Sequence, residues 1–311
     1  MQISGPRYTF SNLSLTSELF VAKSYIVYKN VAGFCSSSVG GCFVIIGFIG
    51  TGAITESVVR GLHSKGSPFE RILVSPRNAQ RASTLASGFS DVTIAADNQA
   101  VIDESDIVCI AVRPQIAEKV LAPLEFPSHK TVLSFVATLS FESLRPWVAP
   151  AACLFRMVPI PAVERGEGPV ILFPPDEDLQ ELFAGLGTIV PVTSESDLHS
   201  LWAVTAFMAP YFGLLHAVSA WLRRRGLEPA DADIFTSAFF DALSTTARAV
   251  HGEGFDELAR EHATLGGLNE QLRRELAAND WFGLTAHGLD LILDRLEGRA
   301  TLEDILRSER P

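Results

Sequence analysis

Cysteine is scarce in this sequence, and its spacing indicates neither disulfide bonds nor a metal site. Four cysteines occur among the 311 residues, and no two of them form a Cys-x-x-Cys pair. Cys109 and Cys153 fall inside predicted strands, so we expect buried thiols in a reducing compartment, which favours the cytoplasm. The HExxH zinc motif and the calcium-loop pattern are also missing, so the sequence predicts no metal ion.

Positive charge is in deficit as well. The 36 acidic residues outnumber the 25 lysines and arginines, which gives a net charge of −11. This argues against nucleic acid or an anionic membrane surface as a partner. No window is expected to reach the length of a transmembrane helix without glycine breaks or charges. The length is sufficient for two domains, and the 47% hydrophobic content is ordinary for soluble proteins.

Residues 1–42 differ from the rest of the chain. They contain eight serines and one acidic residue, Glu18, and they have no clear hydrophobic period. Three interpretations stay open: a disordered tail, a mistaken start codon, or an organellar transit peptide. We favour a dispensable extension.

The most informative stretch is 43–61, FVIIGFIGTGAITESVVRG, which predicts a strand, a glycine turn and a helix. Gly50 permits the tight turn, and Gly52 lets the backbone approach a phosphate group. The N–H groups and the positive end of the helix dipole then hold the anion, as in a dinucleotide-binding βαβ unit. The third small position holds Thr55, which is larger than usual. The alternative is a strand–turn–helix that binds nothing.

The end of the second predicted strand, 71–74, indicates the type of dinucleotide. NAD enzymes usually place an acidic residue there, whereas this chain has Ser75-Pro76-Arg77-Asn78. A hydroxyl and a guanidinium accept a ribose 2′-phosphate, so the sequence favours NADP. Arg81, one helical turn further on, could add positive charge. The alternative is that both arginines lie on a solvated helix start.

Further apolar runs predict buried strands at 91–95, 106–112 and 130–136. Continuous rather than alternating apolar residues indicate strands covered on both faces, hence a parallel sheet between helices. Ligands of such sheets lie beyond the carboxyl ends of the strands. We therefore expect Val112–Pro114 and Val136–Ala137 beside the cofactor.

Three more apolar runs, at 154–158, 168–173 and 189–193, are predicted to extend this sheet, with a helix at 176–186. The predicted cofactor domain therefore covers residues 43–194.

Residues 195–311 predict an all-helical domain. The stretch Leu198–Leu222, interrupted by Pro210, is apolar nearly all round, so it must be covered on every side. In so small a domain this suggests a partner subunit; the alternative is burial within its own chain. The other predicted helices are 229–251, 255–262, 269–278 and 281–296.

The loop at 262–269 places Gly266 and Gly267 directly before an amphipathic helix. Free N–H groups there could hold a carboxylate, which makes the loop a second candidate anion cradle. The alternative is an ordinary turn between helices.

The order of these motifs resembles the pyrroline-5-carboxylate reductase family over residues 43–296. The matching segments are FVIIGFIGTGAITESVVRGL, the turn at 75–78, Asp97-Asn98, and IAVRPQ at 110–115. The resemblance implies an α/β Rossmann-type, mostly parallel sheet that binds NADP(H), followed by an all-α C-terminal domain that interlocks two subunits. It also implies reduction of 1-pyrroline-5-carboxylate, or a similar small cyclic imine, at their junction, as in proline biosynthesis. The cofactor positions are Gly47, Gly50, Gly52, Ala53, Ile54, Ser75, Arg77, Asn78, Asn98, Val112, Arg113 and Pro114.

The resemblance weakens on the substrate side. The family's Arg-x-Met-Pro-Asn segment is RMVPIP at 156–161, and its Ser-Pro-Gly-Gly-Thr-Thr cradle for a carboxylate is TLGGLN at 264–269. The family's proton-donating threonine corresponds to Ser200 or Thr205, depending on where a gap is drawn. The substrate residues carried over are Thr264, Gly266, Gly267, Leu268 and Asn269.

The leading hypothesis is an NADPH-dependent imine reductase in which Ser200 or Thr205 lies near the imine nitrogen, with His262 as a less favoured proton donor. A β-hydroxyacid-type dehydrogenase would need a catalytic lysine in the helical domain, but the last lysine is Lys130. An NADPH-binding protein without catalysis, and a reductase of another imine or a keto substrate, remain alternatives.

Overall fold

The computed structural model describes residues 44–250 and 254–301, so the extension of residues 1–42 lies outside the described residues. The chain divides into two compact units, with the boundary between Ser194 and Glu195.

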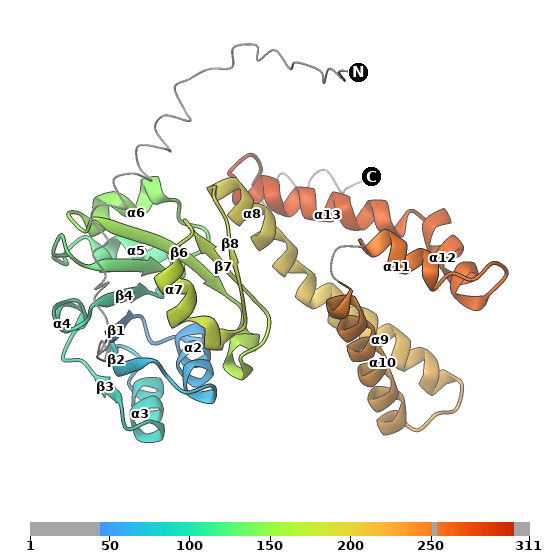
Figure 1. Ribbon diagram of the computed structural model, residues 1–311, viewed down its shortest axis with the longest axis horizontal. Helices are drawn as coiled ribbons and strands as arrows, with labels where there is room; N and C mark the ends of the chain where they lie inside the picture. The colour runs from blue at the N-terminus through green and yellow to red at the C-terminus, as the bar shows by residue number, and fades with distance from the viewer. Residues whose placement is uncertain (1–43, 251–253, 302–311) are drawn as a thin grey trace, which may run out of the picture. The chain divides into compact units, whose positions relative to one another are not determined.

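The first unit is an α/β sandwich built on one sheet (Figure 1). Its described strands are β1 Val44–Ile49, β2 Phe69–Val74, β3 Val92–Ile94, β4 Ile107–Ile110, β5 Thr131–Ser134, β6 Cys153–Pro159, β7 Pro169–Phe173 and β8 Thr188–Pro191. The α-helices are α2 Ala53–Ser64, α3 Ala79–Gly88, α4 Asn98–Glu104, α5 Pro114–Leu121, α6 Phe141–Val148 and α7 Glu177–Leu182, joined by the 3₁₀ helices η1 Pro161–Arg165 and η2 Ala184–Leu186.

The strand order confirms the predicted fold class. The strands follow one another across the sheet as β3-β2-β1-β4-β5-β6-β7-β8, and β1 to β6 are parallel. β7 is antiparallel to β6, and β8 is parallel to β7, so the last two strands run against the others. The direction in which the chain adds strands reverses between β1 and β4, and the carboxyl ends of these strands are where such sheets bind ligands.

A separate hydrophobic core covers each face of the sheet. One core joins the strands to α2, α3 and α7, and the other joins them to α4, α5 and α6. The predicted thiols are buried as expected, with Cys109 in β4 and Cys153 in β6, and burial raises the pKa of Cys109 well above its usual value. The helix predicted at 176–186 is divided into α7 and η2, because its last turn tightens into 3₁₀ geometry before Gly187.

Asp176 caps α7 and gives a testable stability prediction. Its Oδ1 accepts a hydrogen bond of 2.9 Å from the N–H of Leu179. Burial raises the pKa of Asp176; the hydrogen bond acts in the opposite direction, while the nearby Asp178 and Glu177 raise it further. An acid whose folded pKa is raised contributes most to stability at low pH, and this contribution falls as the pH rises through the folded pKa.

Asp176→Asn keeps an acceptor for the Leu179 N–H and removes the charge. We therefore expect the variant to have a higher Tm than the wild type at pH 7, and expect the two values to converge towards about pH 3. Thermal unfolding across this pH range measures both. A variant that unfolds at a lower temperature than the wild type at pH 7 would contradict the prediction.

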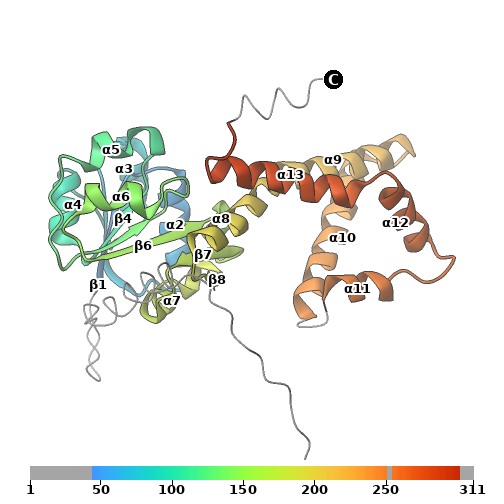
Figure 2. The ribbon, with the colours of Figure 1, turned by 90° about the horizontal axis from the view of Figure 1, so that it is seen from above.

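The second unit is helical. Its described elements are α8 Glu195–Val204, η3 Thr205–Phe207, α9 Met208–Arg224, α10 Pro229–Ala249, α11 Phe255–Glu261, α12 Leu268–Ala278 and α13 Trp281–Leu296. Helices α9 and α10 pack against each other, while α13 packs against α8 and α12 (Figure 2).

Pro210 interrupts the α-helical geometry, as predicted, but does not end the helical run. The 3₁₀ turn η3 separates α8 from α9, and Pro210 lies in the first turn of α9, so the three segments follow one another without a gap. The run Glu195–Arg224 is consequently long and apolar enough to cross a membrane, by length and composition only. A single such helix is weak support for a membrane span. The run contains Gly213 and has charges near its ends, at Glu195, Asp197 and Arg223, so the expectation that no window reaches this length without a glycine or a charge is not contradicted.

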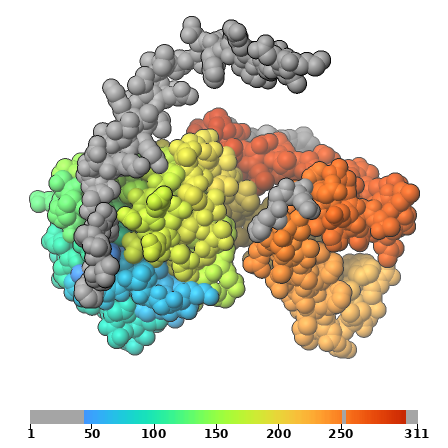
Figure 3. Space-filling model, in the orientation of Figure 1, coloured from blue at the N-terminus to red at the C-terminus, as the bar shows by residue number. Residues whose placement is uncertain are grey.

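The apolar residues of this run are not buried within their own helical unit. Only 6% of its most apolar 18-residue window is buried. Phe212 on α9 is 64% exposed, and Ile234 and Phe235 on α10 are 66% and 59% exposed. Figure 3 shows much of α10 and α12 at the molecular surface. The alternative that this helix is buried within its own helical domain is therefore wrong.

Candidate cofactor site and the loop before helix α12

The turn between β1 and α2 has the geometry expected of a phosphate-binding turn. Gly50 has φ of +106°, a conformation that L-residues rarely adopt, and a Cβ there would lie 2.5 Å from the carbonyl oxygen of Ala111. Its N–H donates a 2.9 Å hydrogen bond to Oγ of Ser75 at the end of β2. A glycine is therefore required at this position by both conformation and space.

Two threonines hold this turn in place. Thr51 Oγ1 donates to the carbonyl oxygen of Ser75 at 2.6 Å, and Thr55 Oγ1 donates to the carbonyl oxygen of Gly50 at 2.6 Å. Both side chains are buried, as is Ser75. Thr55 is larger than the residue usually found at the third small position, but its hydroxyl stabilises the turn by donating to a backbone carbonyl. The hydroxyl group of Thr55 is the feature of the sequence from which this contact could have been predicted.

The N-terminus of α2 is open to an anion. Gly52 is its N-cap, no side chain caps the helix, and a Cβ built on Gly52 would meet no atom within 4 Å. Ala53 and Ile54 form the first turn, with Ala53 exposed and Ile54 half-buried. Uncapped N–H groups with open space before them fit the pyrophosphate of a dinucleotide.

Gly47 has a different environment from the other glycines of the motif. It lies inside β1, where a Cβ would come within 2.1 Å of Ser105 Oγ and 2.7 Å of Val101. It therefore allows α4 to pack closely on the sheet. Its assignment to cofactor binding stays a prediction.

A hollow of about 520 Å³ in the same unit is lined by two of the predicted cofactor residues, Arg77 and Asn98. Lys119 of α5 also lines the hollow. The sequence did not indicate this residue, because it is far from Arg77 along the chain and no motif shows that the two lie close together. Asp97, Gln99, Ile116, Val120, Pro123 and Leu124 complete the wall. Two cations beside an apolar wall suit a phosphorylated ribose next to a flat aromatic base.

The neighbouring polar residues have other partners. Arg81 forms an ion pair of 3.2 Å with Glu56 of α2, which also pairs with Arg60 at 3.0 Å, so the guanidinium of Arg81 is directed towards α2. Asn78 caps α3, its Oδ1 accepting from the N–H of Arg81 at 3.3 Å. Arg77 is exposed, with its side chain lining the hollow. Of the two arginines considered from the sequence, Arg77 is thus the one that lines the hollow.

The carboxyl ends of β4 and β5 lie at the same edge of the parallel sheet as Gly50. Val112 is half-buried there, Arg113 is the exposed N-cap of α5, and Pro114 is its first residue. After β5, the carbonyl oxygen of Ala137 accepts a hydrogen bond from Nη2 of Arg156, which is fully buried.

The candidate catalytic hydroxyls belong to the helical unit. Ser200 is exposed on α8. Thr205 is half-buried in η3, and its Oγ1 donates to the carbonyl oxygen of Trp202 at 2.7 Å. Ser200 is therefore the more accessible hydroxyl, whereas Thr205 would have to release this carbonyl before donating its proton elsewhere.

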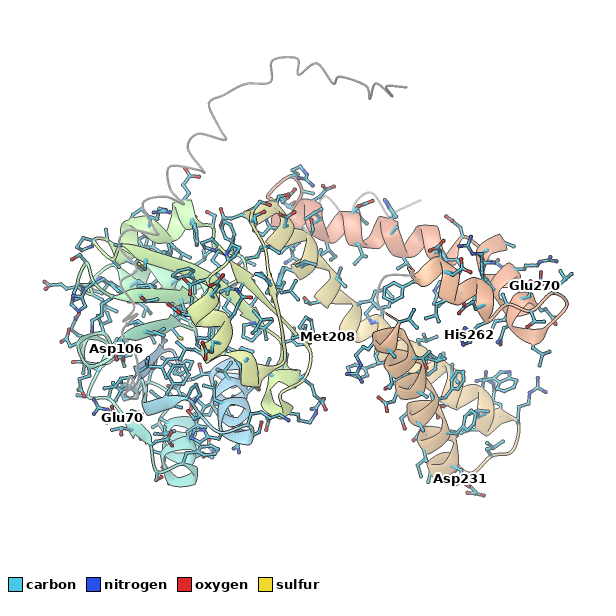
Figure 4. The ribbon with its side chains drawn as sticks, in the orientation of Figure 1. Glu70, Asp106, Met208, Asp231, His262 and Glu270 are labelled. Carbon is cyan, nitrogen blue, oxygen red and sulfur yellow. The ribbon has the colours of Figure 1, made fainter. Side chains whose placement is uncertain are left out.

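The loop before α12 is internally hydrogen-bonded. The N–H of Gly267 donates to the carbonyl oxygen of Thr264 at 2.8 Å, and Asn269 Nδ2 donates to the carbonyl oxygen of His262 at 3.0 Å. Gly266, with φ of +75°, donates its N–H to Oε2 of Glu270 at 2.6 Å. Leu268 is 84% exposed. The sequence indicated the glycines and left Glu270 open as either a solvated or a capping side chain; its contact with Gly266 is a capping one. Glu270 is labelled with His262 in Figure 4.

Residues 45–138 match the family described as NADP oxidoreductase, coenzyme F420-dependent. The pyrroline-5-carboxylate reductase of Haemophilus influenzae is 28% identical over 55% of this chain, and the match spans 66% of that protein, slightly under two thirds of its length. The corresponding protein of Vibrio alginolyticus is 27% identical over 81% of this chain and 96% of its own length. The crystal structure of Plasmodium falciparum pyrroline carboxylate reductase with NADP bound has a TM-score of 0.70, covers 83% of this chain and 98% of its own, and is 15% identical.

Proposed function

We propose that this chain, which belongs to the pyrroline-5-carboxylate reductase family, uses NADPH to reduce a small cyclic imine of the 1-pyrroline type. The observation that carries the proposal is the uncapped N-terminus of α2 after Gly52, in a unit that also has a hollow lined by Arg77 and Lys119. The relatives at 27–28% identity are named pyrroline-5-carboxylate reductases, and pyrroline-5-carboxylate is one imine of this type.

The first unit supplies the groups that would hold NADP(H). The backbone N–H groups after Gly52 would bind the pyrophosphate, while Arg77, Asn98 and Lys119 would bind the phosphorylated ribose. Ser75, which accepts from Gly50, would act by fixing the turn. The remaining proposed positions, Ala53, Ile54, Asn78, Val112, Arg113 and Pro114, are in the first turn of α2, at the cap of α3 and after β4.

When bound, NADPH supplies a hydride to the imine carbon, and the imine nitrogen must gain a proton. The protein therefore has to orient the ring and place a proton donor near its nitrogen. Ser200 is the proposed donor because its hydroxyl is exposed, and Thr205 is the second candidate. Thr264, Gly266, Gly267, Leu268 and Asn269 are the proposed substrate contacts.

The test is an assay with purified protein, NADPH and a panel of cyclic imines that includes 1-pyrroline-5-carboxylate, following the nicotinamide absorbance. Oxidation of NADPH that depends on an imine would support the proposal. Tight NADPH binding without turnover of any imine would instead favour the alternative of a binding protein without catalysis.

We further propose that the exposed apolar residues of α9 and α10 form the interface of a homodimer in the cytoplasm. Exposed large apolar side chains on two helices that pack together are typical of an obligate interface, and the charge of −11 is unfavourable for an anionic membrane.

Replacing Ile234 and Phe235 by Glu would place two charges in that interface. We expect the wild type to run as a soluble dimer in light scattering and the double variant to run as a monomer with little activity. Asp241→Asn, at an exposed polar position of the same helix, is the matched control. A wild type that is monomeric, or that sediments with membranes, would contradict the proposal.

A further inference from the structure

The loop predicted to hold a substrate carboxylate already contains a carboxylate from the protein itself. Glu270 is the third residue of α12, and its Oε2 accepts the N–H of Gly266 at 2.6 Å. The N–H of Gly267 is also used, by the carbonyl oxygen of Thr264. The backbone N–H groups of both loop glycines, which were predicted to hold a substrate anion, are therefore satisfied within the loop.

Glu270 is well held in this position. A glutamate at the third position of a helix that reaches back to a preceding N–H is a stable capping arrangement, and its charge is favourable at the positive end of the helix. Its other oxygen, Oε1, accepts from Arg274 at 2.8 Å, and its side chain is only 15% exposed. A substrate carboxylate would have to displace this group or bind beside it.

Nothing else in the loop compensates for that competition. Leu268 offers no hydroxyl, and the amide nitrogen of Asn269 donates to the carbonyl oxygen of His262. Arg274, a cation on the same helix, is already paired with Glu270. A second carboxylate at this loop would meet a like charge at close range with few donors to hold it, which is unfavourable.

We propose that Glu270 is a specificity-determining residue that directs the enzyme towards cyclic imines without a carboxylate. This inference rests on the proposed function, since it concerns the substrate of that same site. It predicts that the 1-pyrroline ring is recognised and that a carboxylate on the ring lowers, rather than raises, the affinity.

The test compares kcat/KM for 2-methyl-1-pyrroline and for 1-pyrroline-5-carboxylate in the wild type and two variants. Glu270→Gln keeps an acceptor for the Gly266 N–H but removes the charge, and Glu270→Ala frees the N–H as well. We expect the wild type to prefer the uncharged imine. Both variants should shift the ratio towards the carboxylated imine by roughly tenfold or more. Glu275→Gln removes the same charge from an exposed position of α12 and should leave the ratio unchanged.

A wild type that prefers 1-pyrroline-5-carboxylate overturns the inference, and so does a ratio that both Glu270 variants leave unchanged. Turnover of either imine still supports the proposed function in those cases. If no imine is reduced, the proposed function fails, and a calorimetric titration of the NADP⁺-loaded protein with proline decides on Glu270. Tighter proline binding by Glu270→Gln than by the wild type supports its role, and equal affinity overturns it.

Discussion

Arg77→Ala is expected to lower kcat/KM with NADPH by roughly 10- to 150-fold and to leave kcat/KM with NADH nearly unchanged. The size follows from the loss of a charged hydrogen bond to the 2′-phosphate, worth about 1.5–3 kcal/mol. NADH has no phosphate at this position, so it loses nothing. Steady-state kinetics with both coenzymes and a substrate from the imine panel measure the effect.

Two further variants sharpen this experiment. Arg81→Ala removes a cation that is paired with Glu56, so we expect a much smaller change with NADPH. Lys119→Met should weaken NADPH selectively, because Lys119 lines the same hollow as Arg77. Equal losses with NADPH and NADH for Arg77→Ala would show that the 2′-phosphate is not bound there.

The second large effect concerns Gly52. Replacing it by Val should lower Tm only slightly. A Cβ at this position meets no protein atom within 4 Å and the backbone is extended, with φ of −94°, but valine is a poorer N-cap residue than glycine. The side chain would instead fill the space before the N-terminus of α2. We therefore expect NADPH affinity to fall by roughly a hundredfold or more, as measured by fluorescence titration of the purified protein.

Gly50→Ala is the informative comparison. Its Cβ would overlap the carbonyl oxygen of Ala111, and its φ of +106° is strained for alanine, so we expect lower stability as well as weaker binding. Backbone strain of this kind costs on the order of 1–3 kcal/mol before the overlap is counted. If Gly52→Val bound NADPH as tightly as the wild type, the phosphate would not lie against this turn.

The sequence alone determined the local parts of this protein. The run of apolar residues, the glycine turn and the amphipathic pattern after Gly52 predicted β1 and α2, and the same reasoning placed α13 at residues 281–296. These features depend on contacts between residues a few positions apart, so their period and their turn residues record them directly. The position of Arg77 after β2 could be predicted for the same reason.

The tertiary structure alone decided which of these residues are available. It brought Lys119 of α5 into the hollow with Arg77, and it paired Arg81 with Glu56 of α2. It continued the helical run through Pro210, and it placed the carboxylate of Glu270 on the N–H of Gly266. The sequence shows which residues are charged, but it does not show which of those charges form ion pairs. The partner of a charged side chain depends on how the helices pack and on the conformation of the loop. Neither produces a periodic pattern in the sequence.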